Sequence, residues 1–216
     1  METEVQHVLS KTDGRIDALY NNGAISVPGA LEDLPLEALR HVWDINVGGP
    51  HRLSQLVIPA MREQGGGRII TCSSVLGKIP LPLRGAYVSS KFALEGLTDA
   101  LRLELRHSGI HVVLLEPGLI RTSFGSNSSD ALVKWVDIES SHFAKRYQEL
   151  FLDGSAGHRE KNWLFCDPEL VINALIKALE SKSPKSRYVI TPLGRLALIL
   201  NSILPRALKD RILEKL

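Results

Sequence analysis

Apolar runs bounded by turn residues alternate along the chain with longer segments in which apolar residues recur at helical spacing. Such alternation is typical of βαβ units, whose parallel strands form a sheet that helices cover on both faces. The pattern therefore predicts an α/β fold. Four predicted strands are rich in β-branched residues, as buried parallel strands are, and they span residues 15–20, 68–72, 110–116 and 187–190.

Helices are predicted between the strands. The first runs over about residues 35–61 and ends at the glycines of residues 65–67, which stop a helix. The second runs over about residues 85–107, and a Ser-Gly pair ends it. Residues 193–216 are predicted to form an amphipathic tail, because they are apolar at helical spacing on both sides of Pro205.

The chain is expected to fold as one domain over residues 1–216, with residues 119–165 as its substrate-binding segment. This segment is polar, and a connection of that length between core elements is usually a binding segment or a mobile lid. Aromatic residues in or beside it favour either a pocket for a bulky apolar alcohol or ketone or an ordinary core. These residues are Phe124, Trp135, Phe143, Tyr147, Phe151, Trp163 and Phe165.

Composition and charge exclude several other classes of protein. The 216 residues are 44% hydrophobic and 23% charged, as expected for a soluble globular domain. The net charge of +2 arises from interspersed residues without a basic block, so nucleic acid is not an expected partner. The first residues, METEVQHVLSKTDG, include acidic side chains and lack an apolar signal region, which favours a cytoplasmic protein.

No metal site is expected. The two cysteines, Cys72 and Cys166, show no zinc-binding or disulfide spacing, which fits a reducing compartment. His107 and His111 lie four positions apart, but the helix breaker between them favours two surface histidines. Serine hydrolysis is not supported either, because the chain has no GxSxG motif.

The segment GAYVSSKFALEGL, residues 85–97, places Tyr87 and Lys91 four positions apart on one face of a predicted helix. A tyrosine holds its proton to about pH 10, so it acts near neutrality only where a positive charge favours the phenolate. Lys91 can supply that charge. Ser74 stands thirteen residues before Tyr87, at the end of a predicted strand, where ligands of parallel sheets bind. An isolated YxxxK pair would more often be a solvated surface pair.

Two further predicted strands are followed by small or polar residues, in the segments LYNNGAIS and EPGLIRT. Together with the serine and the YxxxK pair, the order of these motifs between Ile16 and Thr122 resembles the short-chain dehydrogenase/reductase family. The segment EGLTDALRLELRHSGIHVVLLEPGLIRT looks most like the branch of retinol and hydroxysteroid dehydrogenases and related bacterial reductases. The resemblance implies a Rossmann-type doubly wound parallel sheet and an NAD(P)-dependent oxidoreductase that interconverts an alcohol and a carbonyl.

The resemblance also implies roles for individual residues. Tyr87 would be the proton donor or acceptor, and Ser74 rather than the neighbouring Ser73 would polarise the substrate carbonyl. Lys91 would lower the pKa of the tyrosine and hold the cofactor ribose, and Asn46 would support a proton-relay water. The cofactor would be NADP or NAD, and the residues bordering it would be Asn21, Ala24, Tyr87, Lys91, Pro117, Gly118, Ile120 and Thr122.

Pro50 lies four residues after Asn46 and has no N–H, so inside a helix it leaves the Asn46 carbonyl without its usual partner. One interpretation is that the freed carbonyl holds a water. The other is that Pro50 only kinks or ends a surface helix.

The chain departs from the family at its start. The family opens with a Gly-rich turn, TGxxxGxG, whose backbone amides approach the cofactor pyrophosphate, and this sequence has none. We therefore interpret the chain as N-terminally truncated and expect weak or no dinucleotide binding. The order Asn21-Asn22-Gly23-Ala24 also reverses the family's Ala-Gly pair, a change that we expect to be tolerated.

The missing turn leaves a second hypothesis, a truncated, non-catalytic relative that serves as a pseudoenzyme or an interaction subunit. The presence of all four catalytic-type residues speaks against it. The resemblance implies a homodimer. The tail has an apolar stripe ahead of Arg206, Lys209 and Arg211, which would either make peripheral contact with a membrane or pack over the substrate pocket or a partner.

Overall fold

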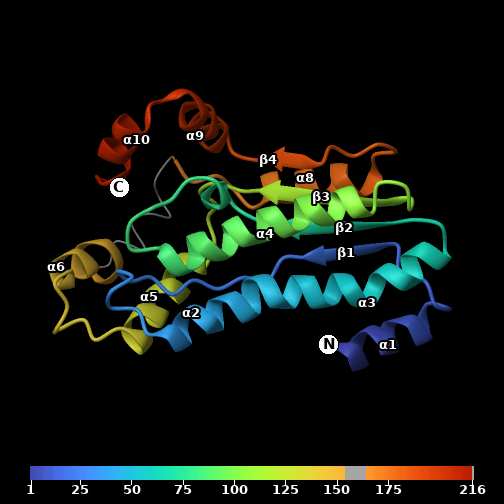
Figure 1. Cartoon of the computed structure of the whole chain (residues 1–216), viewed down its shortest axis with the longest axis horizontal. Coiled ribbons are helices and arrows are strands. Elements are labelled where there is room, and N and C mark those ends of the chain that lie inside the picture. The colour runs from blue at the N-terminus through green and yellow to red at the C-terminus, as the bar shows by residue number, and fades with distance from the viewer. Residues whose placement is uncertain (154–163, 216) are drawn as a thin grey trace.

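The structure is a computed structural model that describes residues 1–153 and 164–215. The described residues form a four-stranded sheet in the order β1-β2-β3-β4, in which every neighbouring pair is parallel (Figure 1). The strands are β1 (Ala18–Asn21), β2 (Gly67–Cys72), β3 (Ile110–Glu116) and β4 (Arg187–Val189). This sheet and its helices confirm the predicted α/β fold. The first strand begins at Ala18, not residue 15, because Arg15 belongs to a hydrogen-bonded turn.

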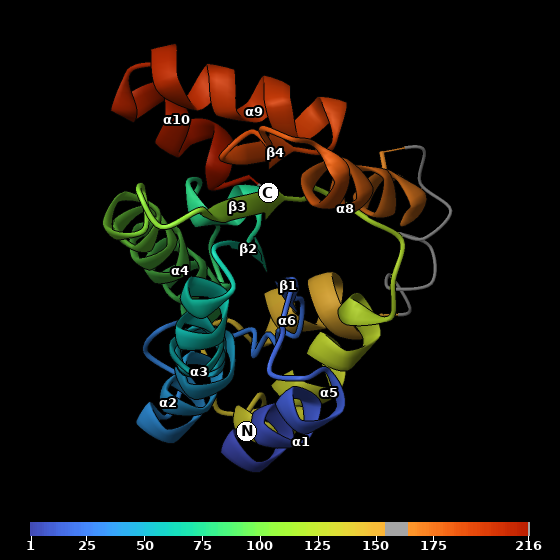
Figure 2. The same ribbon diagram turned by 90° about the vertical axis from the view of Figure 1, so that its right-hand side faces the viewer.

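Helices cover the sheet (Figures 1 and 2). Those before β3 are α1 (Glu2–Lys11), α2 (Leu36–Trp43), the π-helix η1 (Asp44–Gly48), α3 (Gly49–Glu63), the 3-10 helix η2 (Val75–Gly77) and α4 (Gly85–Glu104). Those after β3 are α5 (Phe124–Trp135), α6 (Ala144–Tyr147), the π-helix η3 (Gln148–Leu152), α8 (Glu169–Glu180), α9 (Pro192–Ile203) and α10 (Arg206–Leu213). Among these described helices, none combines the length and the apolar character that crossing a membrane requires.

The two faces of the sheet bury alternate residues of the same strand. On β2, Ile69 packs with Val57 and Met61 of α3, whereas Ile70 packs with Ala174 and Ala178 of α8. Figure 2 shows α3 and α4 on one side of the sheet and α8 on the other. The strands follow one another across the sheet in chain order. The helices of the first two connections lie on one face and α8 lies on the other, so the connection from β3 to β4 has the opposite hand to the two before it. It is an exception to the rule that such connections are right-handed.

The predicted binding segment, residues 119–165, contains regular structure in its described part. Helices α5, α6 and η3 pack with Ala30 and Leu83 in one core cluster, in which Tyr147 and Phe151 are buried. The Tyr147 hydroxyl accepts the Ala30 N–H at 2.7 Å, which ties this core to the loop after β1. The sequence left open whether these aromatic residues form a pocket or a core, and for Tyr147 and Phe151 it is a core. Trp163 lies outside the described residues.

Helix α8 was not among the predicted elements, although its sequence ELVINALIKALE carries apolar residues at helical spacing. Arg68 of β2 holds its C-terminal end. The Arg68 guanidinium donates to the carbonyl oxygens of Ala178 and Ser181 at 3.0 and 2.8 Å, two of the orphan acceptors of a helix end. This pair of bonds fixes the helix of one face to a strand of the sheet.

A close glycine contact joins the turns that precede β2 and β3. Gly109 has a φ of +77°, and a Cβ added there would lie 2.4 Å from the Gly65 carbonyl oxygen. That oxygen belongs to the backbone, which cannot move aside as a flexible side chain can. Gly109 is therefore required both for its conformation and for the close approach of the two turns.

We expect Gly109→Ala to lower the free energy of unfolding by more than about 1 kcal/mol, because left-handed backbone strain adds to the clash. Gly96→Ala is the matched control, since Gly96 is exposed inside α4 and an added Cβ there meets nothing within 4 Å. Alanine should stabilise that helix position by roughly 0.5–1 kcal/mol. Urea denaturation measures both variants, and a Gly109→Ala protein as stable as the parent would contradict the argument.

Candidate active site

The sequence-predicted site residues lie at the carboxyl ends of three neighbouring strands and on the helix beside them. Asn21 ends β1, Ser74 follows β2, and Pro117 and Gly118 follow β3. Tyr87 lies in the first turn of α4. This is the edge of a parallel sheet at which ligands bind.

Ser74 is oriented by the backbone and is paired with Tyr87. It caps the short helix η2, where its Oγ accepts the Leu76 N–H at 3.1 Å. That bond leaves the hydroxyl proton of Ser74 free to be donated elsewhere. Burial raises the pKa of Tyr87, and a hydrogen bond with the Ser74 side chain opposes that rise. The phenol therefore holds its proton at neutral pH, with a serine hydroxyl beside it.

Lys91 lies one helical turn after Tyr87 and is only 2% exposed. Its Nζ donates to the Cys72 carbonyl oxygen at 2.9 Å and lies 5.6 Å from the centroid of the Tyr87 ring. Burial lowers the pKa of the ammonium, while the neighbouring Cys72 and Glu95 raise it. The lysine is thus held at the end of β2 beside the tyrosine. Its lowering of the Tyr87 pKa stays a prediction.

Asn46 lies in η1 and is fully buried. Its Oδ1 accepts the Ile25 N–H at 2.8 Å, and its Nδ2 donates to the Ile25 carbonyl at 2.9 Å and to the Ser90 hydroxyl at 3.0 Å. Ser90 in turn donates to the Tyr87 carbonyl at 2.7 Å. Asn46 therefore connects the loop after β1 to the turn of α4 that carries Tyr87. A water held by its own carbonyl stays a prediction.

Pro50 does not end the helix in which it lies. Helices α2, η1 and α3 follow one another without a break, and Pro50 is in the first turn of α3. A residue without an N–H removes one helical hydrogen bond, and a π-helix is a common local response to such an interruption. The change of helix type falls on the segment that contains Asn46.

The other residues expected to border the cofactor are spread around the same edge. Ala24 lines a cavity of about 290 Å³ beside α5. A Cβ on Gly118 would lie 2.2 Å from the Thr191 hydroxyl oxygen, so a residue larger than glycine does not fit beside Thr191 unless that side chain moves. Ile120 makes a bridge to the segment before α8, and Thr122 is exposed, with its Oγ1 accepting the Phe124 N–H at 3.3 Å.

Buried polar atoms at this edge fit the nicotinamide half of a cofactor. Among the described residues, Asn21 Oδ1, Ser26 Oγ and Ser73 Oγ are buried without a hydrogen-bond partner. Buried polar groups are normally satisfied, so these atoms are available to bond a polar ligand or water. The printed sequence contains no glycine-rich turn of the kind that receives a pyrophosphate. The described residues also hold no group of three or more His, Cys, Asp or Glu suited to a metal ion.

Three contacts of the site were missed at the sequence level. Ser90 links Asn46 to α4, Thr191 closes on Gly118, and Phe124 lies with its ring centroid 5.3 Å from that of Tyr87. Ser90 lies inside the YVSSK motif, and its place next to Lys91 could have marked it as a residue of the site. Phe124 was noted among the aromatic residues of the predicted binding segment, but its contact with Tyr87 joins two separate segments of the chain. Thr191 also comes from a distant segment, and no local pattern marks it.

Comparison with known proteins places these residues in a family. The model of the family described as short chain dehydrogenase matches residues 1–132. The chain is 34% identical over 214 residues to the Escherichia coli (strain K12) protein "Uncharacterized oxidoreductase YbbO", covering 99% of this chain and 73% of that one. It is 34% identical over 180 residues to 17-beta-hydroxysteroid dehydrogenase type 1 of Homo sapiens, covering 83% of this chain and 54% of that one.

Solved structures agree. A short-chain dehydrogenase from Streptomyces avermitilis superposes with a TM-score of 0.73 at 27% identity, covering 97% of this chain and 72% of that one. Another, from Burkholderia cenocepacia J2315 in complex with NADP, superposes with a TM-score of 0.72 at 21% identity, covering 98% and 76%. The second likeness shows the fold alone. The family match and the relatives together show that this chain belongs to the short-chain dehydrogenase family, whose oxidoreductases use NAD or NADP.

Proposed function

We propose that this protein interconverts an alcohol and a carbonyl group of an apolar substrate, with Tyr87 as the proton donor or acceptor. The observation that carries the proposal is the convergence of Tyr87, Ser74 and Lys91 at the end of β2. A phenol, a hydroxyl with a free proton and a buried ammonium are the groups that an oxygen atom needs when it gains or loses a proton.

When bound, NAD or NADP supplies or accepts the hydride, and Asn21, Ala24, Lys91, Pro117, Gly118, Ile120 and Thr122 would hold its nicotinamide and ribose. In the reducing direction, Ser74 donates its free proton in a hydrogen bond to the substrate carbonyl oxygen. Tyr87 then transfers its phenolic proton to that oxygen. The Lys91 ammonium stabilises the phenolate that remains. Asn46 keeps the Tyr87 turn of α4 in place through Ser90.

An apolar substrate is supported by the surroundings of Tyr87. Phe124 packs against its ring and also lines the cavity beside Ala24. Other residues of α5 that line this cavity are the aromatic Trp135 and the polar Asn127, Asp130 and Lys134. A steroid-, retinoid- or lipid-like alcohol or ketone would fit such walls. We propose that Phe124, rather than the core residues Tyr147 and Phe151, contacts the substrate.

A non-catalytic relative is the second candidate function, favoured by the sequence without a glycine-rich turn. In that case the protein would bind dinucleotides weakly and act through its surfaces.

We propose a cytoplasmic homodimer in either case. An apolar-lined cavity of about 140 Å³ lies between α3 and α4, and exposed Leu97 stands on its rim. Sedimentation equilibrium tests the dimer, and cell fractionation tests the location.

The tail carries the surface that we propose for membrane contact. Five residues of α9 form what we call the tail stripe, and each is 38–68% exposed: Leu193, Leu196, Ile199, Leu200 and Ile203. Three basic residues of α10 follow the stripe: Arg206, Lys209 and Arg211. An apolar stripe beside basic residues matches the chemistry of an anionic lipid surface.

The first prediction from the proposed function concerns cofactor binding. NADH and NADPH should bind with affinities close to that of reduced nicotinamide mononucleotide, because the adenosine half meets no glycine-rich turn. Fluorescence titration of the purified protein measures all three ligands, and Lys91→Ala should weaken each of them. Submicromolar NADH or NADPH binding, far tighter than the mononucleotide, would contradict the expected weak dinucleotide site.

The second prediction concerns the chemistry. Tyr87→Phe should lower turnover by about 10²–10⁴, the usual contribution of a positioned acid or base, while leaving the thermal unfolding curve close to that of the parent. Tyr188→Phe on β4 is the matched control and should retain activity. Turnover is followed with a panel of steroid, retinoid and lipid ketones at high NADH or NADPH. A folded parent protein without turnover on any of them would favour the non-catalytic candidate.

The third prediction concerns the tail. The protein should sediment with vesicles of phosphatidylserine and phosphatidylcholine more than with phosphatidylcholine alone, and Leu196→Ser with Ile203→Ser should reduce this binding. Ile172→Ser with Ile176→Ser is the control, since those exposed residues lie on α8. Equal loss in both double variants, or no sedimentation of the parent protein, would exclude the tail stripe as a membrane contact.

A further inference from the structure

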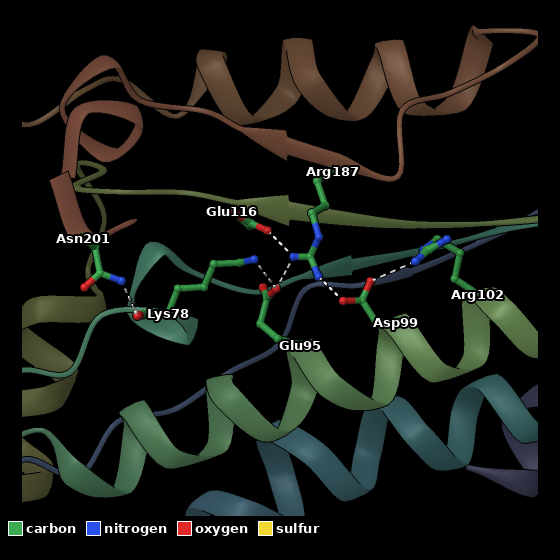
Figure 3. Close-up of polar contacts among 7 residues, drawn as sticks. All are labelled: Lys78, Glu95, Asp99, Arg102, Glu116, Arg187 and Asn201. Atoms are coloured by element: carbon green, nitrogen blue, oxygen red, sulfur yellow. Dashed lines mark hydrogen bonds and ion pairs between the residues drawn. The ribbon is translucent and has the colours of Figure 1, made fainter. Parts of the chain in front are cut away.

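A buried ionic cluster lies one turn beyond Lys91 on α4, and its centre is Arg187 of β4 (Figure 3). The Arg187 guanidinium pairs with Glu95 and Asp99 of α4 and with Glu116 of β3. Glu116 is 1% exposed, and the side chain of Glu95 is 8% exposed. Although burial alone would lower it, the bonds to Glu95 and Glu116 raise the pKa of Arg187. The cluster thus joins α4 to two strands through two buried carboxylates, Glu95 and Glu116, and a partly exposed guanidinium.

Two further cations face the cluster from its edges. Lys78 Nζ lies 3.9 Å from Glu95 Oε2, and Arg102 lies 3.5 Å from Asp99. Asn201 of α9 donates to the Lys78 carbonyl at 3.1 Å, so the loop that carries Lys78 is itself held (Figure 3). The carboxylates of the cluster are therefore surrounded on several sides, and Glu95 is the member that follows Lys91 by one turn of α4.

Glu95 shares its helix face with the active site. Tyr87, Lys91 and Glu95 follow one another at intervals of four residues on α4, so they lie along one face. A Cβ on Gly77 would lie 2.8 Å from Glu95 Cγ and 3.2 Å from the Lys91 carbonyl oxygen. The η2 turn after Ser74 therefore packs against both residues.

One oxygen of Glu95 is not used by the cluster. Among the described residues, Glu95 Oε1 is buried without a hydrogen-bond partner, while Oε2 faces Arg187 and Lys78. Lys91 is an ammonium buried to 2% exposure whose Nζ donates to a neutral carbonyl. Glu95 lies one helical turn further along the same face, where its negative charge favours the Lys91 ammonium against the cost of burial.

We propose that Glu95 is a positioning residue for the reaction, which holds α4 against β3 and β4 through Arg187 and places a negative charge one helical turn from Lys91. It contacts neither substrate nor cofactor and acts through Lys91. The inference rests on the proposed function, and it assigns a role to a residue outside the Tyr-Lys-Ser-Asn set.

The charges around the pair fix the expected sign. Cys72 of β2 and Tyr87 and Glu95 of α4 face Lys91, and Lys78, Arg187 and Glu116 surround Glu95. Neutralising Glu95 removes a term that raises the pKa of Lys91, so that pKa falls further below its ordinary value. The ammonium then loses its proton at a lower pH. The fall in turnover on the alkaline side of the pH–rate profile should therefore begin at a lower pH than in the parent protein.

The test uses Glu95→Gln, which keeps the shape and removes the charge. Nuclear magnetic resonance of ¹³C-labelled lysine side chains, with Lys91→Ala to identify the signal, follows the Lys91 titration in the ligand-free protein. We expect Glu95→Gln to titrate Lys91 at lower pH and to move the alkaline limb of the pH–rate profile the same way, with KM for the substrate little changed. Glu104→Gln is the matched control, because Glu104 is exposed on the same helix.

A second variant tests the proposal even if Glu95→Gln does not fold. Lys78→Met removes the cation that faces Glu95 from a half-exposed position, so Lys91 should titrate at higher pH. An unchanged Lys91 titration in folded Glu95→Gln or in Lys78→Met would overturn the proposal, as would an equal shift in Glu104→Gln. The titration needs no turnover, so its result is separate from a failure of the proposed reaction.

Discussion

The burial of the Lys91 ammonium against the end of β2 is the constraint on which the rest of the site depends. A cation 2% exposed is unfavourable unless polar groups compensate for the lost water. Here the Cys72 carbonyl and the Tyr87 ring contact the ammonium, and the charge of Glu95 favours it from one helical turn away. These partners come from β2 and from α4 itself. Once Lys91 is fixed in this way, the rotation of α4 about its axis is fixed too, and Tyr87 must face the hydroxyl of Ser74.

The parallel sheet gives the second half of this geometry. Because β1, β2 and β3 all run the same way, their carboxyl ends meet at one edge, and the residues after each strand gather there. Asn46 then closes the site from a different helix by bonding both the N–H and the carbonyl of Ile25. The active site is thus a meeting of short local segments, each placed by a long-range packing contact.

This division explains how much could be predicted from the sequence. The strands, the helix with Tyr87 and Lys91, and the place of Ser74 follow from patterns within about twenty residues, since hydrophobic period and motif spacing are local. Arg187 could not be assigned, because its partners are 71 to 92 positions away in sequence and charged pairs leave no periodic signal. The core around Tyr147 was undecided for a similar reason, because its hydroxyl contacts Ala30, 117 positions away.

The tail belongs to the same physical unit as the active site. A Cβ on Gly194 would lie 2.8 Å from Val75, the residue after Ser74, so α9 packs directly on the η2 turn. Asn201 holds the Lys78 carbonyl three residues further along the chain. The inner side of α9 therefore supports the turn that orients Ser74, while the tail stripe remains exposed on the same helix. The same helix therefore has two sides with different surroundings, one packed on the turn that orients Ser74 and one left exposed.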